Sequence, residues 1–291
     1  MSETEGRLYV VSLPIGNLGD ISLRALRTLR SVDVVLAEDT RTTSRVFARY
    51  GIRTKFGKSV YQGVENQRVD AAIALLQEGK RIALVSDAGT PLVSDPGFPL
   101  VRAAIEHDIP VEPVPGASAI LTALVASGAP AHRFVFDGML PRKAAARRDV
   151  LQQIAGEHVR TVVVYESPHR LLATLADLVS ILPNRSIVLA RELTKQHEEF
   201  LRGEPRDLLD ELRCRDRIYG EWVIIVEPPD RNPRDDICGK ASESDSDIDE
   251  TVALLREANV PTKISCRVLR AAFGIPRNEA YRMLSEPREH P

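Results

Sequence analysis

The stretch LVSDAGTPLVSDPG at residues 84–97 begins as an apolar strand and ends in a loop of Asp, Gly, Pro, Ser and Thr. Strand ends in an α/β sheet are rigid, and the loops after them expose backbone N–H and C=O groups to a ligand. Gly89 and Gly97 permit close approach of the backbone, while Pro91 and Pro96 stiffen its path. An ordinary strand-to-helix connection has the same composition, so this loop alone leaves a binding edge and a plain turn open.

Strands and helices alternate on both sides of this stretch. Short apolar runs predict strands at 8–13, 32–37, 81–86 and 111–114. Residues with helical spacing predict helices that contain 23–29, 42–50, 65–77, 100–106 and 118–127. Asp20 or Ser22 is expected to cap the first helix, and Gly51 to end the second. This alternation is typical of a parallel, three-layer α/β domain, which we place at residues 1–117.

A second α/β domain is expected at residues 118–229. The helix that begins at Ser118 is its hinge to the first domain, and its strands follow the break at Gly128-Ala129-Pro130. Its predicted strands are 133–136, 161–165, 186–190 and 222–226. Residues 230–246 are rich in Pro, Asp and Ser and are predicted to be a flexible acidic linker.

Residues 247–291 are expected to be a small helical tail, with helices at 251–258, 262–273 and 276–284. Gly274 lies in the turn between the last two helices, an arrangement that resembles a helix-turn-helix unit. A plain helical appendage for packing or dimerisation is equally compatible with this pattern.

Composition indicates a globular protein of about two domains, since 43% of the 291 residues are apolar and 27% are charged. No stretch approaches the ~20 apolar residues that cross a bilayer, and the polar N-terminus lacks a secretory signal, so we expect a cytoplasmic protein without a membrane anchor. Cys214, Cys238 and Cys266 lie far apart and lack CxxC spacing, which favours free thiols over a metal site or a disulfide framework.

Charge is segregated along the chain although the net charge is only −2. One basic tract carries Arg41, Arg45 and Arg49 at steps of four, so the three guanidinium groups share a helix face. A second tract, at 142–148, contains four cations and no acid. Such faces either bind phosphate groups or are solvated, and both interpretations stay open for these tracts.

The familiar nucleotide and hydrolase fingerprints are missing from this sequence. It contains neither GxGxxG after the first strand nor GxxxxGK[ST], and neither GxSxG nor HExxH. A cofactor would therefore have to be bound by less common loops.

Six motifs in this order resemble the RsmI-type ribosomal RNA small-subunit 2′-O-methyltransferases, within the tetrapyrrole methylase superfamily. They are LPIGNLGDI at 13–21, AEDTR at 37–41, VSDAGTP at 85–91, PGASA at 115–119, YESPHR at 165–170 and ARELTK at 190–195. The resemblance extends from about residue 7 to 227, and the helical tail resembles the family's C-terminal segment. One departure is the region 61–66, which lacks the family's histidines and leaves only Asn66 as a substrate contact.

The resemblance implies an enzyme that uses S-adenosyl-L-methionine to methylate the ribose 2′-oxygen of a decoding-centre cytidine in 16S ribosomal RNA. It implies two α/β domains with the cofactor cleft between them, no metal, a homodimer, and 16S rRNA or the small ribosomal subunit as the partner. The cofactor-binding residues carried over by the motifs are Pro14, Gly16, Ser86, Asp87, Ala88, Gly89, Ser118 and Ala119.

Methyl transfer is an in-line displacement that benefits from a base or hydrogen-bond acceptor for the ribose hydroxyl. The expected catalytic residues are Glu166, Glu192 and Lys195, at the ends of two predicted strands, with His169 as a further candidate. Ion pairs of Glu166 with Arg170 and of Arg191 with Glu192 are the structural alternatives. The expected RNA contacts are Arg41, Arg45, Arg49, Arg142, Lys143, Arg147, Arg148 and Arg170.

Two other functions stay open from the sequence. A methyltransferase acting on a tetrapyrrole such as a corrin precursor would share the fold, although a small anionic macrocycle would not need the basic tracts or the tail. A ribosome-associated or RNA-binding module without enzymatic activity would differ in not needing to bind S-adenosyl-L-methionine.

Overall fold

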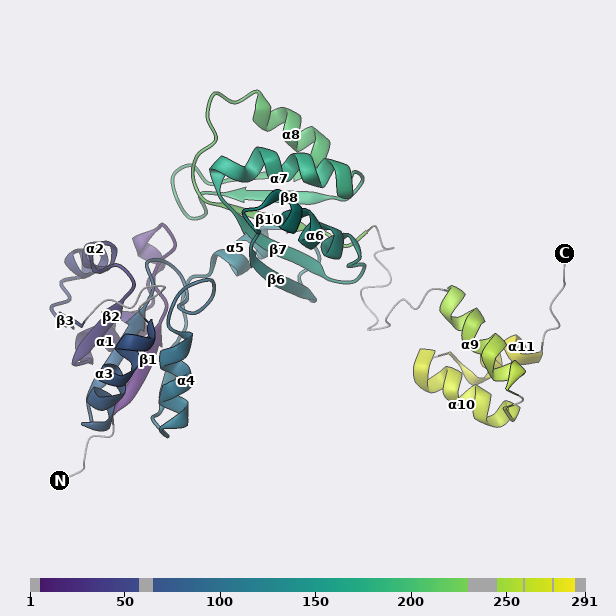
Figure 1. The fold of residues 1–291 in the computed structure, drawn as a ribbon, viewed down its shortest axis with the longest axis horizontal. Coiled ribbons are helices and arrows are strands. Elements are labelled where there is room, and N and C mark those ends of the chain that lie inside the picture. The colour runs from purple at the N-terminus through teal and green to yellow at the C-terminus, as the bar shows by residue number, and fades with distance from the viewer. Residues whose placement is uncertain (1–5, 58–64, 230–244, 259, 274, 286–291) are drawn as a thin grey trace. The chain divides into compact units, whose positions relative to one another are not determined.

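The computed structural model describes residues 6–57, 65–229, 245–258, 260–273 and 275–285 (Figure 1). The chain divides into two compact units, residues 1–228 and 229–291. The first unit contains two five-stranded sheets, and the second is helical.

The first sheet is parallel throughout, with strand order β3-β2-β4-β1-β5. Its strands are β1 (Arg7–Val11), β2 (Val34–Ala37), β3 (Lys55–Phe56), β4 (Arg81–Val85) and β5 (Val111–Val114). The helices around it are α1 (Leu23–Ser31), α2 (Thr40–Tyr50), α3 (Glu65–Gln77) and α4 (Phe98–Glu106), and a 3₁₀ turn η1 (Leu18–Asp20) precedes α1.

Two apolar clusters, one on each face, make this a three-layer domain as predicted. Leu29 of α1 and Phe47 of α2 pack against Val35, whereas Leu76 of α3 and Leu100 of α4 belong to the other cluster. These faces differ because successive side chains of a strand point to opposite sides of the sheet.

Local capping explains where the first helices begin and end. The Ser22 hydroxyl accepts a hydrogen bond from the Ala25 N–H at 3.0 Å, so Ser22 rather than Asp20 caps α1. Gly51 ends α2 in the left-handed conformation, with φ of 63°, as predicted. Leu23 differs from the helical-spacing prediction, because this first residue of α1 is 69% exposed while Leu26 and Leu29 are buried.

The second sheet is mixed, with strand order β6-β7-β10-β8-β9. Its strands are β6 (Phe134–Met139), β7 (Thr161–Glu166), β8 (Ile187–Arg191), β9 (Glu199–Gly203) and β10 (Trp222–Val226). Only β6 and β7 pair in parallel; β10 lies antiparallel between β7 and β8, and β9 is an antiparallel edge strand. The sequence interpretation missed β9 and the two-residue β3, because an edge strand tolerates charged side chains such as Glu199 and Arg202.

Helices cover both faces of the second sheet. They are α5 (Ala119–Ser127), α6 (Ala144–Ala155), α7 (Pro168–Ile181) and α8 (Pro205–Arg213). Residues of α6, α7 and α8 share a cluster with Trp222, Ile224 and Val226, whereas α5 residues share one with Val223 and Ile225. The helix that begins after Ser118 therefore packs on the second sheet.

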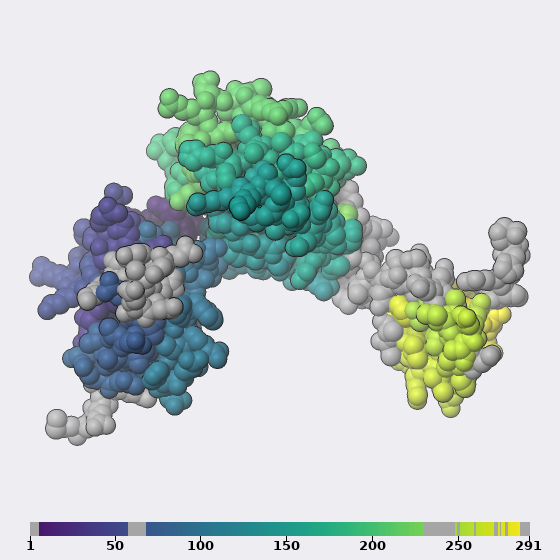
Figure 2. Space-filling model, viewed as in Figure 1, coloured from purple at the N-terminus to yellow at the C-terminus, as the bar shows by residue number. Residues whose placement is uncertain are grey.

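The helical unit contains α9 (Asp245–Glu257), α10 (Thr262–Phe273) and α11 (Arg277–Ser285), coloured yellow-green to yellow in Figure 2. Its small core includes Val252, Leu269 and Ala280. The predicted linker 230–246 lies mostly outside the described residues, and α9 already begins at Asp245. Within the described part of the chain, no helix combines the length and the apolar character required to cross a membrane.

Candidate functional site

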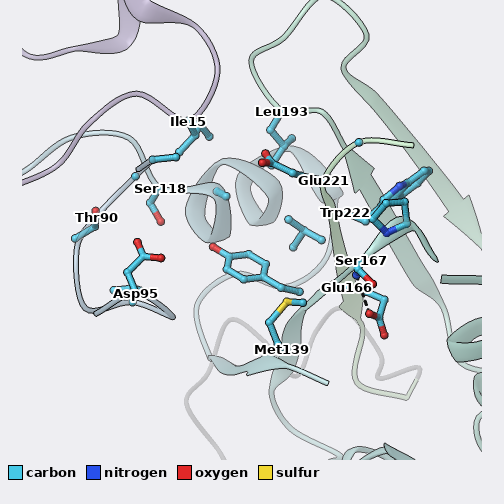
Figure 3. A pocket seen from close by; sticks show the side chains of 18 residues that line it. Ile15, Thr90, Asp95, Ser118, Met139, Glu166, Ser167, Leu193, Glu221 and Trp222 are labelled. Carbon is cyan, nitrogen blue, oxygen red and sulfur yellow. Dashed lines mark hydrogen bonds between the residues drawn. The ribbon is translucent and has the colours of Figure 1, made fainter. Parts of the chain in front are cut away.

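A cavity of about 370 Å³ lies where the loops after the first sheet meet the strand ends of the second sheet (Figure 3). The first set of lining residues follows β1, β4 and β5: Ile15, Ala88, Gly89, Thr90, Val93, Asp95, Ser118 and Ala119. The second set comes from the other sheet and its loops: Met139, Tyr165, Glu166, Ser167, Pro168, Leu193, Gly220, Glu221, Trp222 and Val223. Most of these side chains are apolar or small, and a few carry polar groups.

The loop after β4 forms one wall and is fastened to the loop after β1. The Leu13 N–H donates to the Gly89 carbonyl at 2.8 Å, and the Gly89 N–H donates back to the Leu13 carbonyl at 3.0 Å. Gly89 has φ of 68°, a conformation that side chains disfavour, and the hydroxyls of Ser12 and Thr90 lie 2.9 Å apart. The stretch 84–97 is therefore a rigid edge of the cavity.

The predicted cofactor-binding residues separate into two groups. Ala88, Gly89, Ser118 and Ala119 line the cavity, whereas Pro14, Gly16, Ser86 and Asp87 do not.

Three residues of the second group have close contacts within the loops themselves. The Ser86 hydroxyl donates to the Ala88 carbonyl at 3.0 Å, and the Asp87 carboxylate accepts from the Asp39 N–H at 3.0 Å. A Cβ atom on Gly16 would lie 2.5 Å from Cγ of Lys195, so this position needs glycine for close packing between the two sheets' loops. The positions of Ser86, Asp87 and Gly16 thus favour organising roles for the loops.

Asp95 is a lining residue that the sequence interpretation did not select, although it lies in the stretch 84–97. Figure 3 shows its carboxylate directed into the cavity. Burial raises the pKa of Asp95, the neighbouring Ser86 hydroxyl lowers it, and the Asp87 charge raises it again, with a net upward shift. The one sequence signal that could have identified Asp95 is that Ser94-Asp95, directly before Pro96, repeats the Ser-Asp pair at residues 86–87.

Two further carboxylates, those of Glu38 and Asp87, interact electrostatically with Asp95, although only Asp95 lines the cavity. Burial, followed by the charges of Asp95 and Asp87, raises the pKa of Glu38. Burial also raises the pKa of Asp87, beside the charge of Asp39. Like charges held this close favour a cationic ligand, because a cation relieves their repulsion.

Tyr165 is a second lining residue that was not predicted. Burial and the nearby charges of Asp95 and Glu221 raise the pKa of its phenol to about 12. The hydroxyl therefore stays protonated at neutral pH and acts as a hydrogen-bond donor, not as a base.

Glu166 is one of the lining residues, but its carboxylate makes its contacts within the protein. Its side chain is completely buried and pairs with Nη2 of Arg170 at 2.5 Å. It also accepts from the Thr174 hydroxyl at 2.6 Å and the Ser167 N–H at 2.7 Å. These contacts realise the structural alternative for Glu166 and occupy both of its oxygens.

Glu192 and Lys195 lie beside the cavity in one cluster with Glu221. The Lys195 ammonium contacts the Glu192 carboxylate at 2.9 Å and the Glu221 carboxylate at 3.0 Å. Despite partial burial, its hydrogen bonds to both carboxylates raise the pKa of Lys195, so it stays charged. Among these three residues only Glu221 lines the cavity, and its side chain is 79% exposed. Arg191 pairs with Glu199 instead of Glu192.

The basic tracts also divide into paired and unpaired cations. Arg41 pairs with Asp39, Arg147 and Arg148 pair with Asp177, and Arg170 pairs with Glu166. Arg147 is buried, with its residue only 6% exposed. The exposed residues Arg45, Arg49, Arg142 and Lys143 make no ion pair within the described residues.

Other predicted features are less informative. The side chain of Asn66 and the whole of Cys238 lie outside the described part of the structure. Cys214 and Cys266 are free thiols. Across the described ranges, no group of three or more His, Cys, Asp or Glu side chains is arranged to hold a metal ion.

Comparison with known proteins gives consistent results. Residues 7–209 match the family model described as Tetrapyrrole (Corrin/Porphyrin) Methylases. The "Ribosomal RNA small subunit methyltransferase I" of Micromonospora olivasterospora is 43% identical over 95% of this chain and 85% of that protein. The protein of the same name from Escherichia coli O157:H7 is 42% identical over 97% of this chain and 96% of that protein.

A solved structure shares the fold. The uroporphyrin-III C-methyl transferase from Thermus thermophilus, complexed with S-adenosyl homocysteine, aligns with a TM-score of 0.53 and 20% identity, over 75% of this chain and 97% of that chain. At this level of identity the likeness concerns the arrangement of the two α/β domains.

Proposed function

The chain belongs to the RsmI-type ribosomal RNA small-subunit methyltransferases, within the tetrapyrrole methylase family, and we propose that it methylates the ribose 2′-oxygen of a decoding-centre cytidine in 16S ribosomal RNA. As a methylase of this family, it uses S-adenosyl-L-methionine as the methyl donor. The observation that carries the proposal is the cavity between the two sheets, with the Asp95 carboxylate directed into it.

The residues of the cavity fit this cofactor in size and in chemistry. A volume of about 370 Å³ lies in the range of small-molecule sites, and the lining is mostly apolar with a few polar groups. S-adenosyl-L-methionine carries a sulfonium and an ammonium, both cationic, and Asp95 supplies an anionic partner. Ser118 and Ala119 stand at the N-terminus of α5, where free backbone N–H groups favour a carboxylate.

The bound cofactor supplies an electrophilic methyl group on a positively charged sulfur. The protein's part is to align the ribose oxygen with that methyl group and to keep water out. Ile15, Leu193 and Val223 provide apolar walls from both sheets, and the Tyr165 phenol is a protonated donor within the cavity. Positioning of this kind needs no metal ion.

The proton of the ribose hydroxyl needs an acceptor on the rim of the cavity. We assign this role to the cluster of Glu192, Lys195 and Glu221, with the exposed Glu221 carboxylate facing substrate. Glu192 accepts from the Lys195 ammonium and from the Glu221 N–H at 3.1 Å, so it positions both neighbours. The buried contacts of Glu166 favour a structural role for that residue.

The RNA backbone is proposed to lie along the exposed cations that form no ion pair with any described residue, namely Arg45, Arg49, Arg142 and Lys143. Arg41, Arg147, Arg148 and Arg170, which were also expected to contact RNA, each hold a carboxylate of the protein. A ribosomal substrate places the enzyme in the cytoplasm.

A homodimer is part of the proposal and is supported by the outer face of α5. Leu121 and Val125 lie four residues apart on this helix and are 51% and 77% exposed. Two neighbouring apolar side chains left in water on one helix face suit a contact with a second copy.

Transfer of a tritiated methyl group separates this function from its main rival. Purified protein with labelled S-adenosyl-L-methionine is incubated with small ribosomal subunits from cells that lack the activity, with large subunits, and with an anionic tetrapyrrole. Label in small-subunit RNA alone supports the proposal, whereas label in the tetrapyrrole alone, or in no acceptor, contradicts it.

A further inference from the structure

An exposed aromatic ring stands at the rim of the cavity. Tyr219 is 51% exposed and immediately precedes Gly220, the first of four consecutive residues that line the cavity. The Tyr219 carbonyl accepts from Nε1 of Trp222 at 3.1 Å, which fixes this loop to the start of β10. The ring itself does not line the cavity, so the proposed cofactor site does not account for it.

A buried cation holds the inner face of this ring. The Arg191 guanidinium lies 4.0 Å from the centre of the Tyr219 ring and 5.7 Å from that of Trp222. Arg191 is only 8% exposed, and its Nε and Nη2 atoms are buried with no hydrogen-bond partner among the residues that the structure describes. Stacking on the ring is therefore the main interaction available to this side of the guanidinium.

Ion pairs fix the position of that cation. Nη1 of Arg191 donates to the Glu199 carboxylate at 3.2 Å. Arg215 donates to the two oxygens of the same carboxylate at 2.7 and 2.8 Å. Because Glu199 and Arg191 lie on adjacent strands, the support beneath Tyr219 is part of the sheet. One face of the ring is thus held in place while half of the residue stays open to solvent.

The segment before the ring is basic, although two of its three arginines are held by carboxylates. Residues 213–219 carry Arg213, Arg215 and Arg217 before Tyr219, with Asp216 as the one acid; Arg213 pairs with Asp210, and Arg215 pairs with Glu199 and Glu211. Arg217 is exposed and makes no ion pair within the described residues. A flat aromatic face next to cations is the combination that binds single-stranded RNA, since the ring stacks on a base and the cations contact the backbone.

We propose that Tyr219 is a stacking platform for a nucleobase of the RNA substrate, with Arg217 beside it for a phosphate. The inference rests on the proposed function and extends it, because it gives the rim of the cavity a binding site for a base. Tyr219 precedes Glu221, the residue assigned above to the ribose hydroxyl, by two positions in the same loop.

The test compares Tyr219→Ala and Tyr219→Leu with Tyr219→Phe in the full-length protein. Removal of the ring is expected to raise KM for the small subunit about 5- to 150-fold, with kcat changed much less, because base stacking on an aromatic ring is worth about 1–3 kcal/mol. Tyr219→Phe keeps the ring and is expected to stay within about twofold of the wild type. Tyr219→Leu covers the buried Arg191 without an aromatic face and serves if the alanine variant does not fold.

Labelled single-stranded oligoribonucleotides test base stacking directly. Their dissociation constants are measured by fluorescence anisotropy, with an abasic site placed at each position in turn. One abasic position is expected to weaken binding to the wild type and to have no further effect on Tyr219→Ala. Calorimetry is expected to give the same dissociation constant for S-adenosyl-L-methionine in all variants.

Three results would overturn the stacking platform. The first is an equal rise in KM in Tyr219→Phe and Tyr219→Ala, and the second is an equal effect of every abasic position on the wild type and on Tyr219→Ala. The third is binding of S-adenosyl-L-methionine weakened as much as binding of RNA. Failure of the proposed function is a separate result, because it is the absence of methyl transfer to small-subunit RNA by the wild type. The binding measurements do not depend on that transfer.

Discussion

Replacement of Glu166 by Gln distinguishes a structural carboxylate from a catalytic base. The wild-type carboxylate is fully buried and accepts from Arg170, Thr174 and the Ser167 N–H. Glutamine removes the charge opposite Arg170 and places an amide NH₂ against at least one of these donors. Breaking a buried pair costs about 3–5 kcal/mol, and the 19% exposure of the Arg170 side chain reduces this to about 2–4 kcal/mol.

The expected consequence is a large fall in stability with little change in turnover. For a unit of this size, each kcal/mol shifts Tm by about 2–4 °C, so Glu166→Gln is expected to lower Tm by about 4–16 °C. Unfolding is followed by the fluorescence of Trp222, the single tryptophan, whose backbone pairs with Glu166 across β7 and β10. Methyl transfer by the folded variant, at saturating cofactor and low temperature, is expected within about threefold of the wild type.

Thr174→Val is the matched control for this prediction. It removes one hydroxyl donor to Glu166 at nearly constant volume and is expected to cost about 1 kcal/mol, without loss of turnover. If Glu166→Gln instead keeps the wild-type Tm but loses about 100-fold or more in turnover, Glu166 is the general base and the structural interpretation is refuted.

Three further predictions concern the cofactor, the RNA and the dimer. Asp95→Asn is expected to raise the dissociation constant of S-adenosyl-L-methionine about 10- to 100-fold in calorimetry. Because a cationic ligand favours the ionised form of Asp95, the affinity of the wild type for S-adenosyl-L-methionine should fall as the pH drops below the raised pKa of Asp95. Asp95→Asn with the same affinity as the wild type at every pH would contradict this prediction. Replacing Arg45 and Arg49 by Gln is expected to flatten the salt dependence of RNA binding by about one released counterion each. Arg41→Gln should have less effect, because Arg41 is already paired with Asp39. An equal effect of Arg41→Gln would contradict the division into paired and exposed RNA-binding cations. Val125→Asp should convert a dimer to a monomer in light scattering, and an unchanged mass would exclude this face of α5.

The fold followed from the sequence where short-range patterns determine it. The parallel sheet, the C-terminal end of α2 and the position of α3 were predicted because apolar strands, helical spacing and a left-handed glycine each leave a local signal, whereas α2 begins at Thr40, two residues before its predicted start. The edge strand β9 left no such signal, since its five residues, Glu-Phe-Leu-Arg-Gly, neither alternate between apolar and polar nor form an apolar run, and its pairing with β8 depends on chain that lies outside it.

The site was only partly accessible to the same reasoning. Ala88 and Ser118 were selected because they occur in recognisable motifs, and both line the cavity that we propose for the cofactor. Asp95 and Glu221, which line the same cavity, were not selected, since no spacing rule shows that two loops 126 positions apart face one cavity. Conversely, a carboxylate four residues before a cation, as Glu166 is before Arg170, gives the same sequence pattern whether the carboxylate binds substrate or stabilises the fold.

The most direct test of the central claim is the identity of the methylated nucleoside. Small ribosomal subunits from cells that lack the activity are incubated with the protein and labelled S-adenosyl-L-methionine, and their RNA is digested and mapped. We predict label in 2′-O-methylcytidine at a single decoding-centre position of 16S RNA. Label in a base-methylated nucleoside, at scattered positions or in no RNA would contradict the account.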